Sequence, residues 1–242
     1  MKIVTLTLNP ALDKSAKVDG IITEHKLKCH TISYQAGGGG INVSRVLNRL
    51  GIKTNCIFPV GGDNGLRLKE LLVNESLNIQ SIPIQAWTRE NLSVVDTQNG
   101  QQYRFGMPGN VLADVEVSEL ETLLEKTLSD EDIFVLSGSL AENMDATYYS
   151  KLIKKLTHKN IKVILDTSGS ALKETLNNTI YLIKPNQREL AQLAGKEFLT
   201  KTDQEGFALN LIKTQNIKYV VVSLGANGAF IASEKGIVYY SP

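Results

Sequence analysis

The stretch Gly37-Gly38-Gly39-Gly40-Ile41-Asn42-Val43-Ser44-Arg45 decides the fold, because it joins four glycines directly to a predicted helix. Consecutive glycines are disfavoured inside a helix or strand, since each loses more backbone freedom on folding than any other residue. Apolar side chains follow at helical spacing until Gly51, a residue type common at helix ends. A glycine loop that leads into a helix presents free N–H groups and the positive end of the helix dipole. The stretch therefore favours a seat for a small anionic ligand over a flexible surface turn.

The composition indicates a globular protein without nucleic-acid or membrane partners. A chain of 242 residues forms one α/β domain, or one domain with a small appendage. Its apolar fraction of 42% is enough for a sizeable core. The net charge of +1 gives no basic surface for nucleic acid, no apolar run is long enough to cross a bilayer, and the first ten residues lack the form of a secretion signal. We therefore expect a cytoplasmic protein.

The cysteines and histidines indicate no zinc site. Cys29 and Cys56 are not spaced as metal ligands, and His25, His30 and His158 are scattered. One disulfide would satisfy the count of two cysteines, but two reduced thiols are the expectation for a cytosolic protein.

Apolar runs that predict strands alternate with segments of helical periodicity. Strands are expected at 2–8, 51–60, 133–136, 162–165, 180–183 and 219–222, and helices at 66–72, 116–128, 145–157, 170–176, 187–193 and 202–214. Continuously apolar strands separated by helices predict a mostly parallel sheet covered by helices on both faces.

Two regions of alternating polar and apolar residues do not fit that sheet. They span about residues 15–35 and 88–107, and the second contains Asn99-Gly100, a strong hairpin signal. We expect both regions to form a small β lid inserted into a single α/β domain that spans residues 1–242.

Polar or glycine-rich residues follow five successive predicted strands. In an open α/β sheet, ligands bind where the strands end. The residues at these points are Asn9 and Asp13, then Ser137 to Ser139, Asp166 to Gly169, Lys184 to Glu189, and Ser223 to Gly228. Each alone fits a helix cap, as the spacing of Asn186 and Glu189 illustrates, but together they favour a ligand cleft.

Two arginines, Arg89 and Arg104, flank the predicted lid hairpin. The planar fork of arginine suits bidentate binding of phosphate, although two solvated surface cations fit the sequence equally well. Asp13, after the first strand, is placed to accept hydrogen bonds from sugar hydroxyls. A carboxylate opposite a glycine loop and two arginines suits a phosphorylated polyol.

Taken together, these motifs resemble the ribokinase-like carbohydrate kinases, and within them the group of the minor bacterial isozyme of ATP-dependent 6-phosphofructokinase. The resemblance runs from residue 2 to residue 242. It is carried by LTLNPALD (6–13), the glycine loop (37–45), WTRENL (87–92), QYRFGMPG (102–109), LSGSL (136–140), DTSGSAL (166–172), IKPNQREL (183–190) and VVVSLGANGA (220–229). It implies a ribokinase-like α/β fold and transfer of a phosphoryl group from ATP, with Mg²⁺, to a sugar phosphate, foremost fructose 6-phosphate.

The resemblance also implies a role for each matching residue. The sugar would be held by Asp13, Gly38, Gly39 and Asn42, and its phosphate by Arg89, Arg104 and Ser139. Lys26 would reach into the site of a neighbouring subunit, because members of this group form homodimers through their lids. The nucleotide cleft would be lined by Lys184, Asn186, Ser223, Gly225 and Gly228. Magnesium would be organised by Glu189 with Asn186, largely through water, in keeping with its preference for oxygen ligands and retained hydration.

The chain departs from the family pattern in two places. After LSGSL the family usually has Pro-Pro-Gly, whereas this chain has Ala141-Glu142-Asn143. The family's Gly-Ala-Gly-Asp motif, which supplies the anion hole and the aspartate base, lies downstream of Pro242, and the segment 225–228 is not that motif. We therefore assign no catalytic residue within the sequence. Without that base, anion hole and covering helices, we expect the 242-residue polypeptide alone to be nearly inactive and to expose apolar surface.

Other functions remain open at this stage. A tagatose-6-phosphate kinase or a 1-phosphofructose kinase would use the same phosphate grip, although the segments GGGGINV and QYRFGMPG look more like the phosphofructokinase branch. From another class, the chain would be a non-catalytic sugar-phosphate-binding remnant. A nucleoside or ribose kinase fits poorly, because it has no need for paired arginines.

Overall fold

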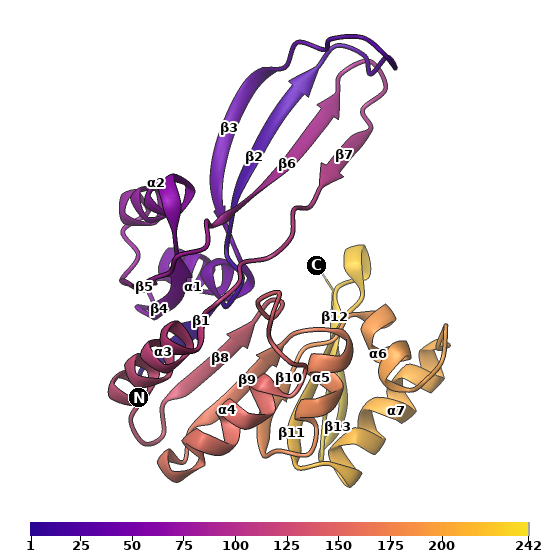
Figure 1. Cartoon of the computed structure of the whole chain (residues 1–242). Coiled ribbons are helices and arrows are strands. Elements are labelled where there is room, and N and C mark those ends of the chain that lie inside the picture. The colour runs from indigo at the N-terminus through magenta and orange to yellow at the C-terminus, as the bar shows by residue number, and fades with distance from the viewer. Residues whose placement is uncertain (242) are drawn as a thin grey trace.

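A computed structural model of the chain describes residues 1–241, so the expectations that concern Pro242 and any residues after it lie outside the described residues. The structure has two parts: a large sheet flanked by helices, and a smaller sheet that projects from one edge of the first (Figure 1). The smaller sheet is called the lid below.

The large sheet has nine strands in the order β13-β12-β11-β10-β9-β8-β1-β4-β5. The strands are β1 (Ile3–Leu6), β4 (Asn55–Val60), β5 (Ile79–Pro83), β8 (Ile133–Ser137), β9 (Lys162–Asp166), β10 (Ile180–Ile183), β11 (Ile217–Ser223), β12 (Ala229–Ser233) and β13 (Gly236–Tyr240). All neighbours pair in parallel except β11 with β12 and β12 with β13. The predicted parallel sheet is confirmed.

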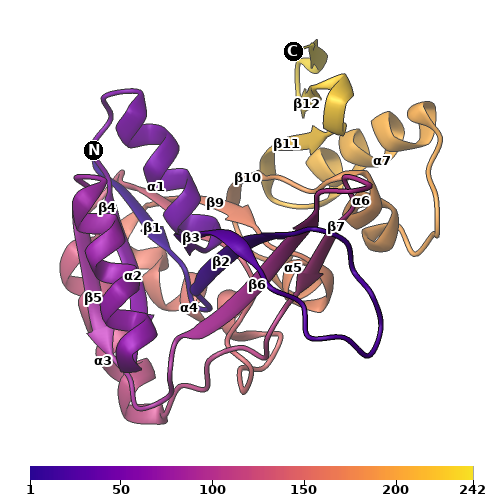
Figure 2. The same cartoon turned by 90° about the horizontal axis from the view of Figure 1, so that it is seen from above.

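Helices lie on both faces of this sheet, as predicted. One face carries α1 (Gly39–Arg49) and α2 (Gly62–Asn74), which lie side by side when seen from above (Figure 2). The other carries α3 (Asp114–Thr127), α4 (Tyr148–Leu156), α5 (Gly169–Thr175), α6 (Gln187–Leu193) and α7 (Lys201–Thr214). Each face of the sheet has its own hydrophobic core, and successive residues of β4 point to opposite cores. Cys56 and Phe58 pack in the smaller core, under α1 and α2, whereas Ile57 packs in the larger core on the other face. None of the helices in the described part of the chain is long and apolar enough to cross a membrane.

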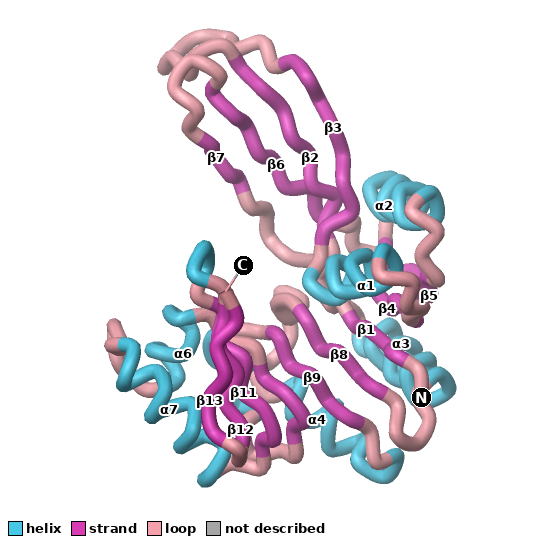
Figure 3. The backbone as a smooth tube through the Cα atoms, turned by 180° about the vertical axis from the view of Figure 1, so that it is seen from behind, coloured by secondary structure: helices cyan, strands magenta, loops and turns pink. Residues whose placement is uncertain are grey.

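The helices cover the two faces unequally. In the strand register, Cys56 pairs with Thr5, Thr5 with Val135, and Val135 with Ile164. Paired residues point to the same face, so all four side chains lie on the α1 side of the sheet. Farther along that side, no helix of the described residues lies over β9 to β13 (Figure 3). Apolar side chains continue there, and Val238 at the end is 55% exposed. This half of the sheet face is therefore open in the described structure.

The lid has four strands in the order β3-β2-β6-β7. They are β2 (Ala11–Val18), β3 (His30–Gly37), β6 (Arg89–Asp96) and β7 (Gln102–Phe105). β6 and β7 form an antiparallel hairpin around the predicted Asn99-Gly100 turn, and β2 pairs in parallel with β6. The first lid strand begins at Ala11, before the predicted limit of about residue 15, because the chain enters the lid directly after Pro10.

Candidate functional site

Parallel strands bring their carboxyl ends to one edge of the sheet, and the lid is attached at that edge (Figure 1). The polar segments that follow β1, β8, β9, β10 and β11 all lie there, as the sequence predicts. The candidate site is this edge together with the lid face above it.

The four glycines connect the lid to α1 by a path that leaves no room for side chains. A β-carbon on Gly39 would lie 2.3 Å from Ser137 Oγ, and one on Gly40 would lie 2.8 Å from the Leu6 carbonyl oxygen. Gly38 has a φ of 137°, which L residues rarely adopt. The Ile41 N–H donates to Thr7 Oγ1 at 3.0 Å. The first turn of α1 is therefore packed tightly against β1 and the end of β8.

Asp13 lies directly beside the glycine loop. A β-carbon on Gly37 would come within 2.1 Å of Asp13 Oδ2, while Asp13 Oδ1 accepts a hydrogen bond from Asn91 Nδ2 at 2.9 Å. Asn42, in the first turn of α1, accepts a hydrogen bond from Arg45 at 2.6 Å. The structure thus brings together the carboxylate and the glycine loop that the sequence assigns to the sugar.

Arg89 begins β6 and reaches back to the body of the protein. Its guanidinium donates to the carbonyl oxygens of Asn9 and Met107, both at 3.2 Å, and its Nε is buried without a hydrogen-bond partner. Burial lowers the pKa of Arg89, and the nearby charges of Asp13 and Glu142 oppose that shift. A buried donor without a partner is suited to receive an anion.

Ser139 is joined to Arg89 through Asn9, a residue that the sequence analysis placed after the first strand but gave no role. Asn9 Nδ2 donates to Ser139 Oγ at 3.0 Å, and the Asn9 carbonyl accepts from Arg89. The residue before Ser139, Gly138, accepts a hydrogen bond from the Tyr149 hydroxyl at 3.3 Å, and burial raises the pKa of that phenol. The part that Asn9 plays in the candidate site is visible only from its hydrogen bond to Ser139, which is 130 residues away in the sequence.

Two predicted sugar-phosphate residues stand apart from this group. Arg104 pairs in register with Ser93, on the same lid face as Arg89 but about 13 Å farther along the strand. Its guanidinium donates to Gln102. Lys26 lies exposed in the connection between β2 and β3, at the far end of the lid. Within residues 1–241, neither side chain forms a hydrogen bond or ion pair with the body of the protein, so their predicted roles remain predictions.

On the nucleotide side, Lys184 forms an ion pair with Asp166, with Nζ and Oδ1 3.0 Å apart. Asp166 Oδ2 also accepts a hydrogen bond from Ser137 Oγ at 3.2 Å. Asp166, the last residue of β9, therefore connects Ser137, which contacts the glycine loop, to Lys184, which the sequence predicts to bind the nucleotide. The sequence placed Asp166 after a strand but could not show which partners it meets.

Asn186 and Glu189 form the capping arrangement that the sequence left as an alternative. Asn186 Oδ1 accepts from the Glu189 N–H at 2.9 Å, and Glu189 Oε2 accepts from the Asn186 N–H at 2.8 Å. Asn186 also lies beside Ser223 in a parallel bridge. A capping role leaves carboxylate oxygen free for water or metal, so the two interpretations are compatible.

No group of three or more His, Cys, Asp or Glu side chains able to hold a metal occurs within residues 1–241. Magnesium needs few protein ligands, because it keeps much of its water and binds substrate phosphates. The carboxylates at the nucleotide edge, Asp166 and Glu189, are donors of the kind that magnesium prefers.

Gly225 and Gly228 shape the loop after β11. Their φ angles are 63° and 85°, and the Leu224 N–H donates to the Gly228 carbonyl at 2.8 Å. A β-carbon on Gly228 would lie 2.0 Å from the carbonyl oxygen of Tyr240. The loop is therefore a tight, glycine-dependent turn at the strand ends, and its nucleotide-binding role remains a prediction.

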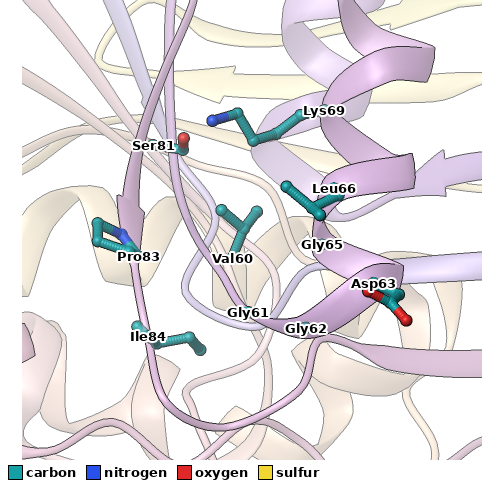
Figure 4. A pocket seen from close by; sticks show the side chains of 10 residues that line it. All are labelled: Val60, Gly61, Gly62, Asp63, Gly65, Leu66, Lys69, Ser81, Pro83 and Ile84. Atoms are coloured by element: carbon teal, nitrogen blue, oxygen red, sulfur yellow. The ribbon is translucent and has the colours of Figure 1, made fainter.

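A hollow of about 450 Å³ lies elsewhere, between α2 and β5 (Figure 4). Val60, Leu66 and Ile84 give it an apolar lining, and Lys69 extends over it from α2 toward Ser81. It contains none of the predicted site residues, and the chemistry described above does not involve it.

Comparison with known proteins places these features in context. The model of the family described as "pfkB family carbohydrate kinase" matches residues 7–242 of this chain. The chain is 38% identical to ATP-dependent 6-phosphofructokinase isozyme 2 of Escherichia coli, over 100% of this chain and 78% of that protein. It is 34% identical to 1-phosphofructokinase of Vibrio cholerae, over 100% of this chain and 75% of that protein. The crystal structure of Escherichia coli phosphofructokinase-2 with fructose-6-phosphate superimposes with a TM-score of 0.95 at 37% identity, covering 100% of this chain and 80% of the other.

Proposed function

Because the chain belongs to the pfkB family of carbohydrate kinases, we propose that, together with the family's downstream catalytic segment, it transfers a phosphoryl group from ATP to fructose 6-phosphate. One observation carries the choice of a sugar phosphate. Asp13 lies against the glycine loop at the strand ends, and its charge opposes the lowering of the pKa of the half-buried Arg89, which reaches back to the Asn9 carbonyl. A ligand with hydroxyls at one end and a phosphate at the other would suit this arrangement, because the hydroxyls can donate to Asp13 and the phosphate can accept from Arg89.

In this proposal the sugar hydroxyls bind Asp13 while the amides of Gly38 and Gly39 and the side chain of Asn42 hold the sugar from the α1 side. Arg89 and Ser139, already linked through Asn9, bind the phosphate. Arg104 joins them when the lid moves toward the body, because it lies on the same lid face as Arg89.

The nucleotide lies along the edge that continues from Lys184 to the Gly225–Gly228 turn. Lys184, held by Asp166, neutralises phosphate charge, and Asn186, Ser223 and the two glycines line the cleft. Mg²⁺, held through water by Glu189 with Asn186, would screen the phosphates when bound.

Phosphoryl transfer relies chiefly on positioning and on charge stabilisation. The residues above position the acceptor hydroxyl and the phosphates, and closure of the lid excludes water from the transfer. We assign no general base within residues 1–241.

The proposal includes a homodimer through the lids and a cytoplasmic location. A structure of the similar Escherichia coli enzyme is described as tetrameric, and Lys26, exposed at the lid end, would reach another subunit in such a dimer. Both cysteines are free, which suits a reducing compartment. Sedimentation of the wild type and of a variant with the lid end deleted tests the dimer, and cell fractionation tests the location.

The second candidate is a 1-phosphofructokinase, which the 34% identity to the Vibrio cholerae enzyme favours. A tagatose-6-phosphate kinase and a non-catalytic sugar-phosphate-binding protein are further alternatives, since the same anion site would serve all of them.

Calorimetric titration of the full chain separates these functions. Fructose 6-phosphate should bind more tightly than tagatose 6-phosphate, fructose 1-phosphate and unphosphorylated fructose, and ATP with Mg²⁺ should bind independently. Tighter binding of fructose 1-phosphate would replace the proposed substrate, and sugar-phosphate binding without ATP binding would favour the non-catalytic protein. Absence of binding by every sugar phosphate would refute the proposal.

A further inference from the structure

The segment that leaves the lid is tied to the loop that follows β8. Residues 106–113 form this linker between β7 and α3. Glu142 Oε2 accepts a hydrogen bond from the Gly109 N–H at 3.2 Å, and the Glu142 N–H donates to the Asn110 carbonyl at 2.8 Å. The carboxylate of Glu142 is therefore fixed against the linker.

The next residue strengthens the same attachment. Asn143 Oδ1 accepts from the Leu112 N–H at 3.1 Å, and Asn143 Nδ2 donates to the Leu112 carbonyl at 2.7 Å. Glu142 and Asn143 thus clasp the linker together, and only Glu142 carries a charge.

The linker that Glu142 and Asn143 hold packs on Asn9, which contacts the candidate phosphate-binding residues Ser139 and Arg89. A β-carbon on Gly109 would come within 2.6 Å of Asn9 Nδ2, so the linker residue bonded to Glu142 packs directly on Asn9. Asn9 in turn contacts Ser139 and Arg89 at 3.0 and 3.2 Å. The Glu142 carboxylate therefore stands beside the place where the phosphate would bind.

The carboxylate acts there through space. Glu142 forms no ion pair within residues 1–241, yet its charge is among the causes that raise the pKa of Arg89 against the lowering effect of burial. Its side chain is exposed, so solvent and salt weaken its field without removing it.

We propose that Glu142 is a positioning residue that also limits how tightly this site holds a phosphate dianion. The inference rests on the proposed sugar-phosphate site. The hydrogen bond to Gly109 holds the linker in place, and the negative charge opposes a second, doubly negative group nearby. Because Glu142 is exposed, its field is weakened as in bulk water, and for a separation of about 8 Å the repulsion then weakens binding by about two- to sixfold at low salt.

Two substitutions separate the charge from the hydrogen bond. Glu142→Gln removes the charge and keeps an oxygen that accepts from Gly109, whereas Asn143→Ala removes the neutral contacts to Leu112 and leaves the charge. Glu119→Gln, at an exposed position of α3, is the matched control for loss of a carboxylate.

The experiment is calorimetric titration of the full chain with fructose 6-phosphate in low salt and in 0.5 M salt, a concentration at which the Debye length falls to about 4 Å. E142Q should bind about two- to sixfold more tightly than the wild type in low salt, and the difference should shrink in high salt. E119Q and N143A should show no tightening, and the affinity of E142Q for unphosphorylated fructose should match that of the wild type.

Equal or weaker binding of fructose 6-phosphate by E142Q would overturn the inference. Should circular dichroism show that E142Q is unfolded, Glu142→Asn takes its place with the same expected tightening, because it also removes the charge and keeps an amide oxygen as an acceptor for the Gly109 N–H. A wild type that binds no sugar phosphate would instead refute the proposed function, and this inference with it.

Discussion

Gly39 and Ser137 touch where the first helix meets the end of β8: a β-carbon on Gly39 would lie 2.3 Å from Ser137 Oγ and 2.7 Å from the backbone nitrogen of Gly138. This contact fixes the N-terminus of α1 relative to the loop that carries Ser139. The amides of the glycine loop and the loop that carries Ser139 are therefore held in one arrangement.

Substitution Gly39→Ala should damage the site. The added methyl group has no room against backbone, so α1 or the loop after β8 must shift. We expect fructose 6-phosphate binding to weaken by at least about tenfold, because misplaced donors lose charge-assisted hydrogen bonds. Calorimetry measures the affinity and thermal unfolding measures the stability.

The matched control is Gly206→Ala in α7, where a β-carbon meets nothing within 4 Å. Alanine is favoured over glycine within a helix, so this variant should gain about 0.5–1 kcal/mol of stability with unchanged affinity. Wild-type affinity in G39A would show that the close contact is irrelevant to binding.

Substitution Arg89→Ala should weaken binding of phosphorylated sugars selectively. The half-buried guanidinium offers a donor without a partner, and a hydrogen bond to a charged group is worth about 1.5–3 kcal/mol. The affinity for fructose 6-phosphate should therefore fall by about ten- to a hundredfold. Unphosphorylated fructose should show little change.

Arg104→Ala is the comparison for Arg89→Ala, since Arg104 is exposed and its hydrogen bonds within residues 1–241 go to Gln102. A smaller loss is expected from this variant, because Arg104 lies farther along the lid from Asn9 and Ser139. Equal losses for phosphorylated and unphosphorylated sugars in R89A would mean that the guanidinium supports the fold and does not bind phosphate.

Substitution Asp166→Asn should weaken ATP binding and spare the sugar. The Asp166–Lys184 pair is partly exposed, with side-chain exposures of 30% and 42%, so its loss costs about 1 kcal/mol or less. We expect the Kd for ATP, measured by titration with Mg²⁺ present, to rise by about two- to fivefold. A larger effect on fructose 6-phosphate than on ATP would contradict this placement of the nucleotide.

The two thiols should differ sharply in reactivity. Cys29 is exposed, whereas Cys56 is buried and burial raises its pKa, so its reactive thiolate is scarce at neutral pH. A thiol reagent should modify one cysteine quickly and the second only on unfolding, with Cys29→Ser abolishing the fast phase. Two fast phases in the native protein would contradict the burial of Cys56.

The parallel sheet could be predicted from sequence because its strands contain short apolar runs: β8 is apolar and almost fully buried, and β11 is apolar from Tyr219 to Val222 although one of its faces is open. Strands at the edges gave weaker signals. β5 mixes polar residues with a proline, and the residues of β13 are half-buried or exposed, so neither shows the pattern of a central strand.

The site was predictable to the level of its loops but not of its contacts. Glycines and polar residues after strands marked Asp13, Asp166 and the glycine loop, because parallel topology brings strand ends together. The bonds from Asn9 to Ser139, and from Glu142 to Gly109, join residues far apart in sequence. No local pattern encodes such pairs, since they depend on the path of the lid linker.

Asp96 should hold the end of the lid together. It is 2% exposed, and its carboxylate accepts four hydrogen bonds: from the N–H groups of Gly20 and Ile21, at 3.1 Å each, and from Gln98 N and Asn99 Nδ2 at 2.9 and 3.0 Å. Asp96→Ala leaves those donors without partners, at a cost of about 3 kcal/mol.

The loss should be local, because the lid has its own sheet and few contacts with the main core. Hydrogen exchange should accelerate at residues 18–21 and 97–100, while β8 and β9 keep their protection. Asp130→Ala, at an exposed position between α3 and β8, should leave exchange unchanged throughout. Since the proposed dimer forms through the lid, the D96A dimer should also dissociate at a higher protein concentration than the wild-type dimer. Unaltered exchange at the lid end in D96A would show that these hydrogen bonds do not organise it.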